Sequence, residues 1–132
     1  MQVEVVSPEK LLFSSEAISV EIPGADGDMT AMANHAPLIT TLRPGILCVV
    51  QEKDTSEYVV TGGFAELGQG VSVLAEKAVL KADFDKKMFD ELVAVAEESL
   101  EAAKANMTGD AVDMAAKFLS DFNSLGESLG FK

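Results

Sequence analysis

The residue types that most often carry chemistry are scarce in this sequence. Of its 132 residues, one is a histidine, His35, and one is a cysteine, Cys48. A histidine-based metal site would need several carboxylates to complete it, and a thiolate zinc site would need more cysteines. Cys48 stands in the apolar run 46–50, where we expect a buried thiol that ionises poorly, so a nucleophilic pair with His35 is disfavoured. We predict no catalytic residue, no metal and no cofactor.

The glycine-rich segments do not match a ligand-binding motif either. The loop 24–28 resembles part of a calcium loop, but it lacks the later bidentate glutamate. The glycines at 62–63 and 68–70 belong to neither a GxxxxGK[ST] nor a GxGxxG pattern that leads from a strand into a helix. We interpret all of them as turns, and we predict a protein that docks to other proteins rather than an enzyme.

Composition limits the partners. The hydrophobic fraction is 48%, enough for a folded core, and the formal net charge is −12. Such a charge repels phosphate backbones and anionic lipid surfaces, so we expect no nucleic-acid binding and no direct membrane binding. The segment 1–6 has no basic stretch and no long apolar run, and the single cysteine fits a reducing compartment. The sequence therefore predicts a cytosolic location.

The first 82 residues show the pattern of short strands. Several alternate apolar and polar residues, and turn-forming glycine, proline and aspartate residues separate them. The expected strands lie at 3–6, 17–22, 46–51, 58–60 and 71–74. Many short strands at such spacing predict an antiparallel β-sandwich or barrel over residues 1–82.

From residue 83 the apolar period becomes helical. One stripe contains Phe84, Met88, Leu92, Val95, Ala96, Leu100 and Ala103, and a second contains Ala111, Met114, Ala115, Phe118, Leu119 and Phe122. Asp83 and Thr108 are the expected N-caps of the two helices. We therefore predict a helical hairpin over residues 83–132, whose last part, 123–132, frays.

Five segments of the first half, taken together, resemble a known family. They are 7–14, 20–28, 35–45, 62–66 and 71–76, and their order and spacing are similar to those of the epsilon subunit of rotary ATP synthases, called delta in mitochondria. The resemblance covers nearly all of residues 2–82, and the helical tail agrees in position and length. It implies a ten-stranded antiparallel β-sandwich followed by a C-terminal antiparallel two-helix hairpin.

The resemblance also implies a role. The chain would be a non-catalytic rotor subunit in the central stalk of a proton-translocating ATP synthase, joining the gamma shaft to the c ring and coupling proton flow to ATP synthesis. It would reach the cytoplasmic face of a bacterial inner membrane only as a peripheral part of the complex. The resemblance also implies a contact of the hairpin with the alpha and beta subunits. The alternative is a regulatory inhibitor of ATP hydrolysis that acts through this hairpin.

By the same resemblance, two sets of residues face partners. Asp26, Gly27, Asp28 and His35 would face the c ring, and Ser7, Ala36, Pro37, Leu38, Thr40 and Leu42 would face gamma. The aspartates could pair with basic residues of the c-ring loops or could only support their turn by Asx bonding. For Asp26 both interpretations stay open, and for Asp28 the contact is favoured. For His35 a structural role at a strand edge is preferred.

Two departures from the family pattern matter. Asn34 stands where many relatives have glycine, and asparagine can still take the positive φ that such a turn requires. Several relatives have a sequence pattern at the start of the first helix that is tied to ATP binding. This chain keeps its aspartate, Asp85, but has Met88 in place of its arginine. ATP sensing is therefore doubtful, and the second helix offers only Lys117 as a basic residue. We expect the hairpin to stay folded and to inhibit hydrolysis weakly or not at all, which deletion of residues 84–132 would test.

Overall fold

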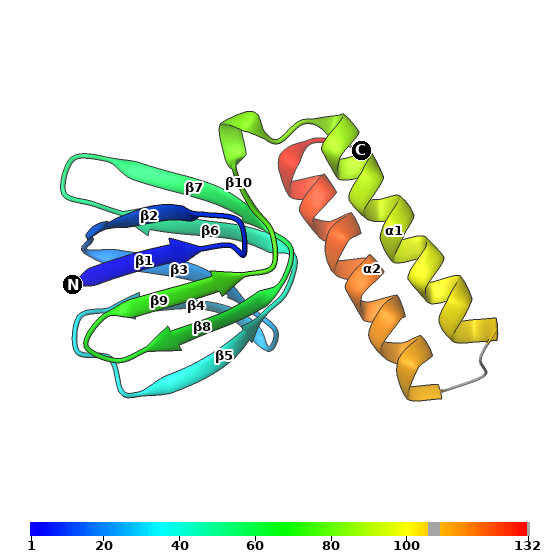
Figure 1. Ribbon diagram of the computed structural model, residues 1–132, viewed down its shortest axis with the longest axis horizontal. Helices are drawn as coiled ribbons and strands as arrows, with labels where there is room; N and C mark the ends of the chain where they lie inside the picture. The colour runs from blue at the N-terminus through cyan, green and yellow to red at the C-terminus, as the bar shows by residue number, and fades with distance from the viewer. Residues whose placement is uncertain (106–108, 132) are drawn as a thin grey trace. The chain divides into compact units, whose positions relative to one another are not determined.

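The computed structural model describes residues 1–105 and 109–131, and the chain divides into two compact units (Figure 1). The first, the head, spans Met1–Asp83, and the second, the hairpin, spans Phe84–Lys132. The expected cap Thr108 lies outside the described residues. Each unit has its own set of buried apolar side chains and is described by itself.

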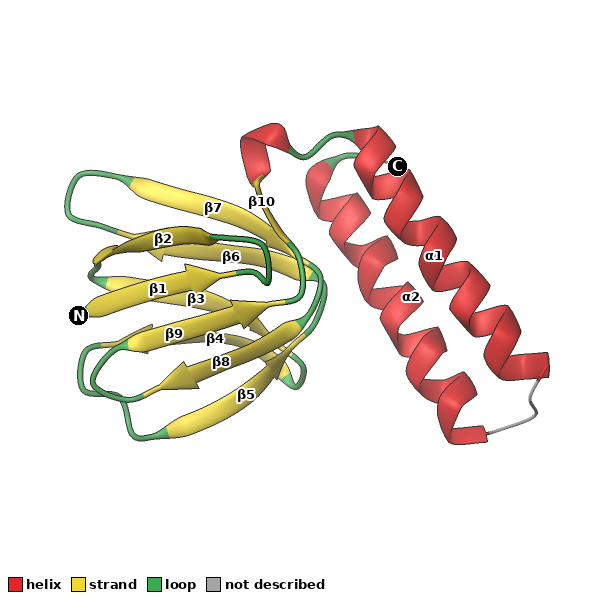
Figure 2. Ribbon diagram, viewed as in Figure 1, coloured by secondary structure: helices red, strands yellow, loops and turns green. Residues whose placement is uncertain are grey.

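The head consists of ten strands (Figure 2). They are β1 (Gln2–Val6), β2 (Leu11–Glu16), β3 (Ser19–Gly24), β4 (Gly27–Met32), β5 (Leu38–Leu42), β6 (Gly45–Val50), β7 (Thr55–Val60), β8 (Gly63–Leu67), β9 (Val71–Ala75) and β10 (Ala78–Leu80). A 3₁₀ turn, η1 (Lys81–Asp83), follows β10. Each of the five strand segments expected from the sequence falls on an observed strand, and the ten-stranded fold is confirmed.

Hydrogen bonds join the strands in the order β10-β7-β6-β3-β5-β8-β9-β1-β2, and β4 pairs with β3. Strands β3 and β5 meet at a single pair, Gly24 with Leu42, where the sheet folds over on itself. In Figure 1, β1, β5, β8 and β9 lie in front of β3, β4 and β6, which gives the two layers of a sandwich. The inward side chains form one core, with Val20, Ile22 and Leu47 at most 1% exposed.

One strand pair departs from the antiparallel prediction. Strand β1 pairs with β9 in parallel, from Val3 opposite Val71 to Val6 opposite Leu74, while β1 pairs with β2 antiparallel. The paired residues Val3 and Val71 lie 68 positions apart along the chain, so no turn between β1 and β9 could reveal their pairing. The sandwich is therefore closed by a long-range contact of the first strand.

The second unit is a hairpin of α1 (Lys86–Ala105) and α2 (Gly109–Leu129). The expected cap Asp83 is wrong, because it belongs to η1 and the backbone N–H of Met88 donates to the Asp85 carboxylate at 2.8 Å. The first turn therefore starts two residues later than expected. Phe89, Ala96 and Ala103 are buried, whereas Val95 of the expected stripe is exposed.

The expected fraying of residues 123–132 is also wrong. Helix α2 continues to Leu129, and Phe122, Leu125 and Gly126 are buried. The ring of Phe131, beyond the helix end, lies 5.4 Å from the ring of Phe89. The glycines that suggested a mobile end instead serve close packing and helix termination, as argued below.

Candidate docking surfaces

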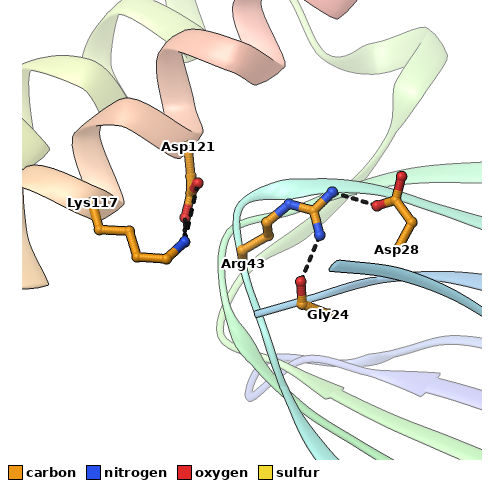
Figure 3. Close-up of polar contacts among 5 residues, drawn as sticks. All are labelled: Gly24, Asp28, Arg43, Lys117 and Asp121. Carbon is orange, nitrogen blue, oxygen red and sulfur yellow. Dashed lines mark hydrogen bonds and ion pairs between the residues drawn. The ribbon is translucent and has the colours of Figure 1, made fainter. Parts of the chain in front are cut away.

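The acidic residues assigned to the c ring lie where β3 turns into β4. Asp26 is exposed in this two-residue turn, and Gly27 begins β4 with a φ of 139°. Asp28 pairs with Arg43, whose guanidinium also donates to the carbonyl oxygen of Gly24 (Figure 3). The only arginine of the chain thus neutralises Asp28, whereas Asp26 has no ion-pair partner among the described residues.

His35 lies at the other end of strand β4 from Asp26. The preceding Asn34 takes the expected positive φ, 62°, which confirms that asparagine can make this turn. The ring nitrogen Nδ1 of His35 lies 2.7 Å from the carbonyl oxygen of Ala36, as in a hydrogen bond donated by the Nδ1-protonated tautomer. The structure therefore does not bring the four residues of the c-ring set together: three lie at one end of β4 and His35 lies at the other.

The residues assigned to gamma are similarly divided. Ala36 and Pro37 are exposed beside His35 and lead into Leu38, the exposed first residue of β5. Ser7 follows β1, and Thr40 is half-buried in the middle of β5. Leu42 is 7% exposed and packs in the core, so its side chain is not available to a partner.

Sequence reasoning missed a group of exposed apolar side chains on the outer face of β5, β8 and β9. We call Ile39, Phe64 and Leu74 the apolar strip; they are 68%, 53% and 51% exposed. Phe64 stands between Leu74 of β9 and Thr41 of β5, directly across the strands from both. Ile39 follows two residues away on the same face of β5. Neighbouring large apolar residues that the rest of the head leaves exposed mark a surface for a partner.

The expectation of a buried Cys48 needs correction. Leu47 and Val49 point into the core, so Cys48 between them lies half-buried on the outer face, across from Glu21 and Glu57. Desolvation, a hydrogen bond to the Glu21 carboxylate and the negative charges of Glu21 and Glu57 raise the pKa of the Cys48 thiol from 9.0 to about 11, against an opposing effect of Lys81. The thiol is accessible but remains protonated at neutral pH.

This pKa gives a first prediction. At pH 8 the thiolate fraction of folded Cys48 should be about 100-fold lower than that of the unfolded chain, so alkylation by iodoacetamide should slow by about that factor. The rate should rise tenfold per pH unit between pH 8 and 10, below the pKa. A Glu21→Gln variant should react faster than the parent chain, because one neighbouring negative charge is lost. Equal rates for the folded and unfolded chains would contradict the assignment.

The polar residues of the hairpin have local partners. Asp85 caps α1 and Met88 occupies its first turn, so the aspartate of the degraded ATP pattern has a structural role. Lys117 lies 3.2 Å from Asp121 one turn along α2, as Figure 3 shows. Exposed pairs of this kind contribute little to stability, about 0.3–0.5 kcal/mol. The basic residue of α2 is therefore already paired within its own helix.

Within residues 1–105 and 109–131, no group of three or more histidine, cysteine, aspartate or glutamate side chains could hold a metal ion. No helix in this part of the chain is long and apolar enough to cross a membrane. The head carries several open hollows. One of them, beside the β8–β9 turn, is lined by residues such as Glu4, Glu66 and Ser72.

A ten-stranded β-sandwich with an exposed apolar strip, followed by a two-helix hairpin, defines a class of two-unit β-sandwich proteins. The comparisons narrow this class. Residues 1–81 match the family model described as ATP synthase, Delta/Epsilon chain, beta-sandwich domain. The ATP synthase epsilon chain of Fuscovulum blasticum is 51% identical over 132 residues, covering 99% of this chain and 97% of that protein. That of Ruegeria sp. (strain TM1040) is 48% identical, with 96% and 93% covered.

Solved structures agree in fold. A chain of the Euglena gracilis mitochondrial ATP synthase (OSCP/F1/c-ring) has a TM-score of 0.71 at 21% identity, covering 96% of this chain and 79% of that chain. A chain of the central stalk/c-ring of the Tetrahymena thermophila enzyme has a TM-score of 0.53 at 14% identity, with 67% and 68% covered. This chain belongs to the ATP synthase delta/epsilon family, as an F-type epsilon subunit. It is an accessory subunit of the complex and is not itself catalytic.

Proposed function

We propose that this subunit works in the rotor of a proton-translocating ATP synthase, where it joins the gamma shaft to the c ring and so couples proton flow to ATP synthesis. The observation that carries the proposal is the apolar strip on the head. A rotor joint must bind its shaft through a stable interface, and such interfaces are centred on apolar and aromatic side chains that water does not reach.

The gamma-facing surface in this proposal is centred on the apolar strip. Ile39 lies between Leu38 and Thr40 in β5 but points to the opposite face of the strand, so the strip lies on a different face of β5 from the one that the resemblance assigns to gamma. Phe64 supplies the large aromatic side chain that interface centres favour. Leu42 is not part of this surface, because it packs in the core of the head.

The c-ring-facing surface in this proposal is the β3–β4 turn. Asp26 is exposed there and has no ion-pair partner among the described residues, so its charge is available to a basic loop. Asp28 is already paired with Arg43, so we assign it to the support of the turn. A contact between exposed charges of this kind weakens as salt is added.

The location and the remaining partners follow from this role. The subunit would lie at the cytoplasmic face of a bacterial inner membrane and would associate with the membrane only through the complex. Inhibition of ATP hydrolysis through the hairpin, by contact with the alpha and beta subunits, is the second candidate. No observation on the hairpin favours it, since Asp85 caps α1 and Lys117 pairs with Asp121.

The proposal is tested by site-specific photo-crosslinking within the assembled enzyme, purified through a tag on gamma. A photoreactive phenylalanine analogue replaces Ile39 in one variant, Asp26 in a second and Glu52 in a third. Glu52 is exposed in the β6–β7 turn, away from both surfaces. We expect position 39 to link to gamma, position 26 to link to the c subunit, and position 52 to link to neither. Absence of the chain from the gamma-tagged complex would overturn the proposal.

A further inference from the structure

The chain turns back on itself directly after α2. Gly130 takes a φ of 75°, its N–H donates to the carbonyl oxygen of Glu127 at 3.1 Å, and the N–H of Phe131 donates to that of Gly126 at 2.8 Å. These two bonds, with a left-handed glycine between them, form the Schellman motif that ends a helix. The motif fixes the direction of Phe131, which therefore does not trail into solvent.

The ring of Phe131 returns to the beginning of the hairpin. Its centroid lies 6.0 Å from that of Phe84 and 5.4 Å from that of Phe89, and both ring pairs are tilted. Phe84 is the first residue of the hairpin unit, and Phe89 is fully buried in the first turns of α1. Tilted aromatic pairs at this distance stabilise a fold beyond the area that they bury. The end of the second helix is thus joined to the start of the first.

A glycine inside α2 makes this arrangement possible. Glycine weakens a helix interior relative to alanine, yet Gly126 stands inside α2, three residues before its last residue, Leu129. A Cβ at position 126 would fall on the ring of Phe89. The missing side chain lets Phe89 reach the backbone of α2, directly beside Phe131. Gly126 and Gly130 therefore serve the same aromatic cluster.

We propose that the contact of the Phe131 ring with Phe84 and Phe89 keeps the hairpin closed, and we call this contact the clasp. Two antiparallel helices are covalently joined at one end only, where α1 leads into α2, so they can separate from the other end. The cluster of Phe84, Phe89 and Phe131 lies at that other end. Any separation of the two helices must begin with release of Phe131, and its contacts set how often this occurs.

Hydrogen exchange of the full chain, read by mass spectrometry, tests the clasp. We expect Phe131→Ala to accelerate exchange at least tenfold both in the last turns of α2 and in the first turns of α1, around Phe89. Exchange in the head should not change. The matched control is Met114→Ala, which removes a large apolar side chain that is 74% exposed on the same helix, and it should change exchange less than twofold.

A second variant separates a clasp from a simple helix cap. Gly130→Ala strains the left-handed position, so it should accelerate exchange in the same two segments as Phe131→Ala. If either variant accelerates exchange only in the last turn of α2 and leaves the segment around Phe89 protected, Phe131 merely ends its helix and the proposal fails. The proposal also fails if Phe131→Ala changes neither segment by more than twofold.

Discussion

A Phe64→Asp substitution should leave the head folded and yet remove the subunit from the gamma-containing complex. The ring is 53% exposed in the centre of the apolar strip, so a carboxylate there meets water in the free chain. At an apolar interface the same carboxylate would be buried without a partner, which costs several kcal/mol. A loss of more than about 2 kcal/mol corresponds to a decrease in affinity of more than about 30-fold. We expect recovery of the subunit with tagged gamma to fall at least tenfold.

Ile18→Asp is the matched control for this substitution. Ile18 is 55% exposed and directly precedes β3, whereas the turn that contains Asp26 follows the same strand, and Ile18 does not belong to the strip. The same charge introduced there should leave recovery unchanged. Both variants should keep the urea midpoint of the free chain. Equal recovery of the two variants, whether high or low, would refute the assignment of the strip to gamma.

The apolar strip could have been found from the phase of the strands. In 71–74 the residues Val71 and Val73 point inward, so Leu74 shares its side of β9 with Ser72 and must point outward. Phe64 is likewise out of phase with Ala65 and Leu67 of β8. A large apolar residue on the polar phase of a strand is the signal that was overlooked.

Other features left no such signal. The run 46–50 is entirely apolar, so no alternation shows that Cys48 points outward while Leu47 points inward. The packing of Leu42 depends on the single pair that β5 makes with β3, which the strand pattern does not specify. The strand pattern alone predicts five strands. The number ten is implied only by the resemblance to the family.

In the hairpin the apolar spacing allowed more than one buried face. The expected stripe included Val95, which is exposed, and omitted Phe89, which is buried although it also stands at helical spacing to Leu92 and Ala96. The end of the chain was misjudged for a related reason. A glycine near a chain end indicates disorder unless the residue that packs against it is known. For Gly126 that residue is Phe89, on the other helix.

Among glycine-to-alanine substitutions in the sandwich, Gly63→Ala should destabilise the head the most. Gly63 begins β8 with a φ of 123° and is paired on both sides, with Leu42 of β5 and Ala75 of β9. An added Cβ would lie against the carbonyl oxygen of Leu74 and 2.9 Å from the Cα of Ala75. Both neighbours are backbone atoms of a paired strand, so they cannot rotate away.

The expected size follows from these two effects. Backbone strain at a non-glycine residue costs about 1–3 kcal/mol, and overpacking costs about as much again. Together they amount to about 2–6 kcal/mol, a large part of the stability of about 5–15 kcal/mol that is typical of a folded domain. Gly68→Ala is the control, because nothing lies within 4 Å of its added Cβ, and it should change stability by less than about 0.5 kcal/mol.

Urea titration followed by tyrosine fluorescence measures this difference in the head alone. Tyr58 is the only tyrosine, the chain has no tryptophan, and the tyrosine ring is buried in the core of the head. Its signal therefore reports on the sandwich whether or not the hairpin unfolds separately. The midpoint of Gly63→Ala should fall well below those of the parent chain and of Gly68→Ala. If the two glycine variants share one midpoint, β8 can shift away from β9, and the pairing of Gly63 with Ala75 is not the rigid contact that places Phe64 in the strip.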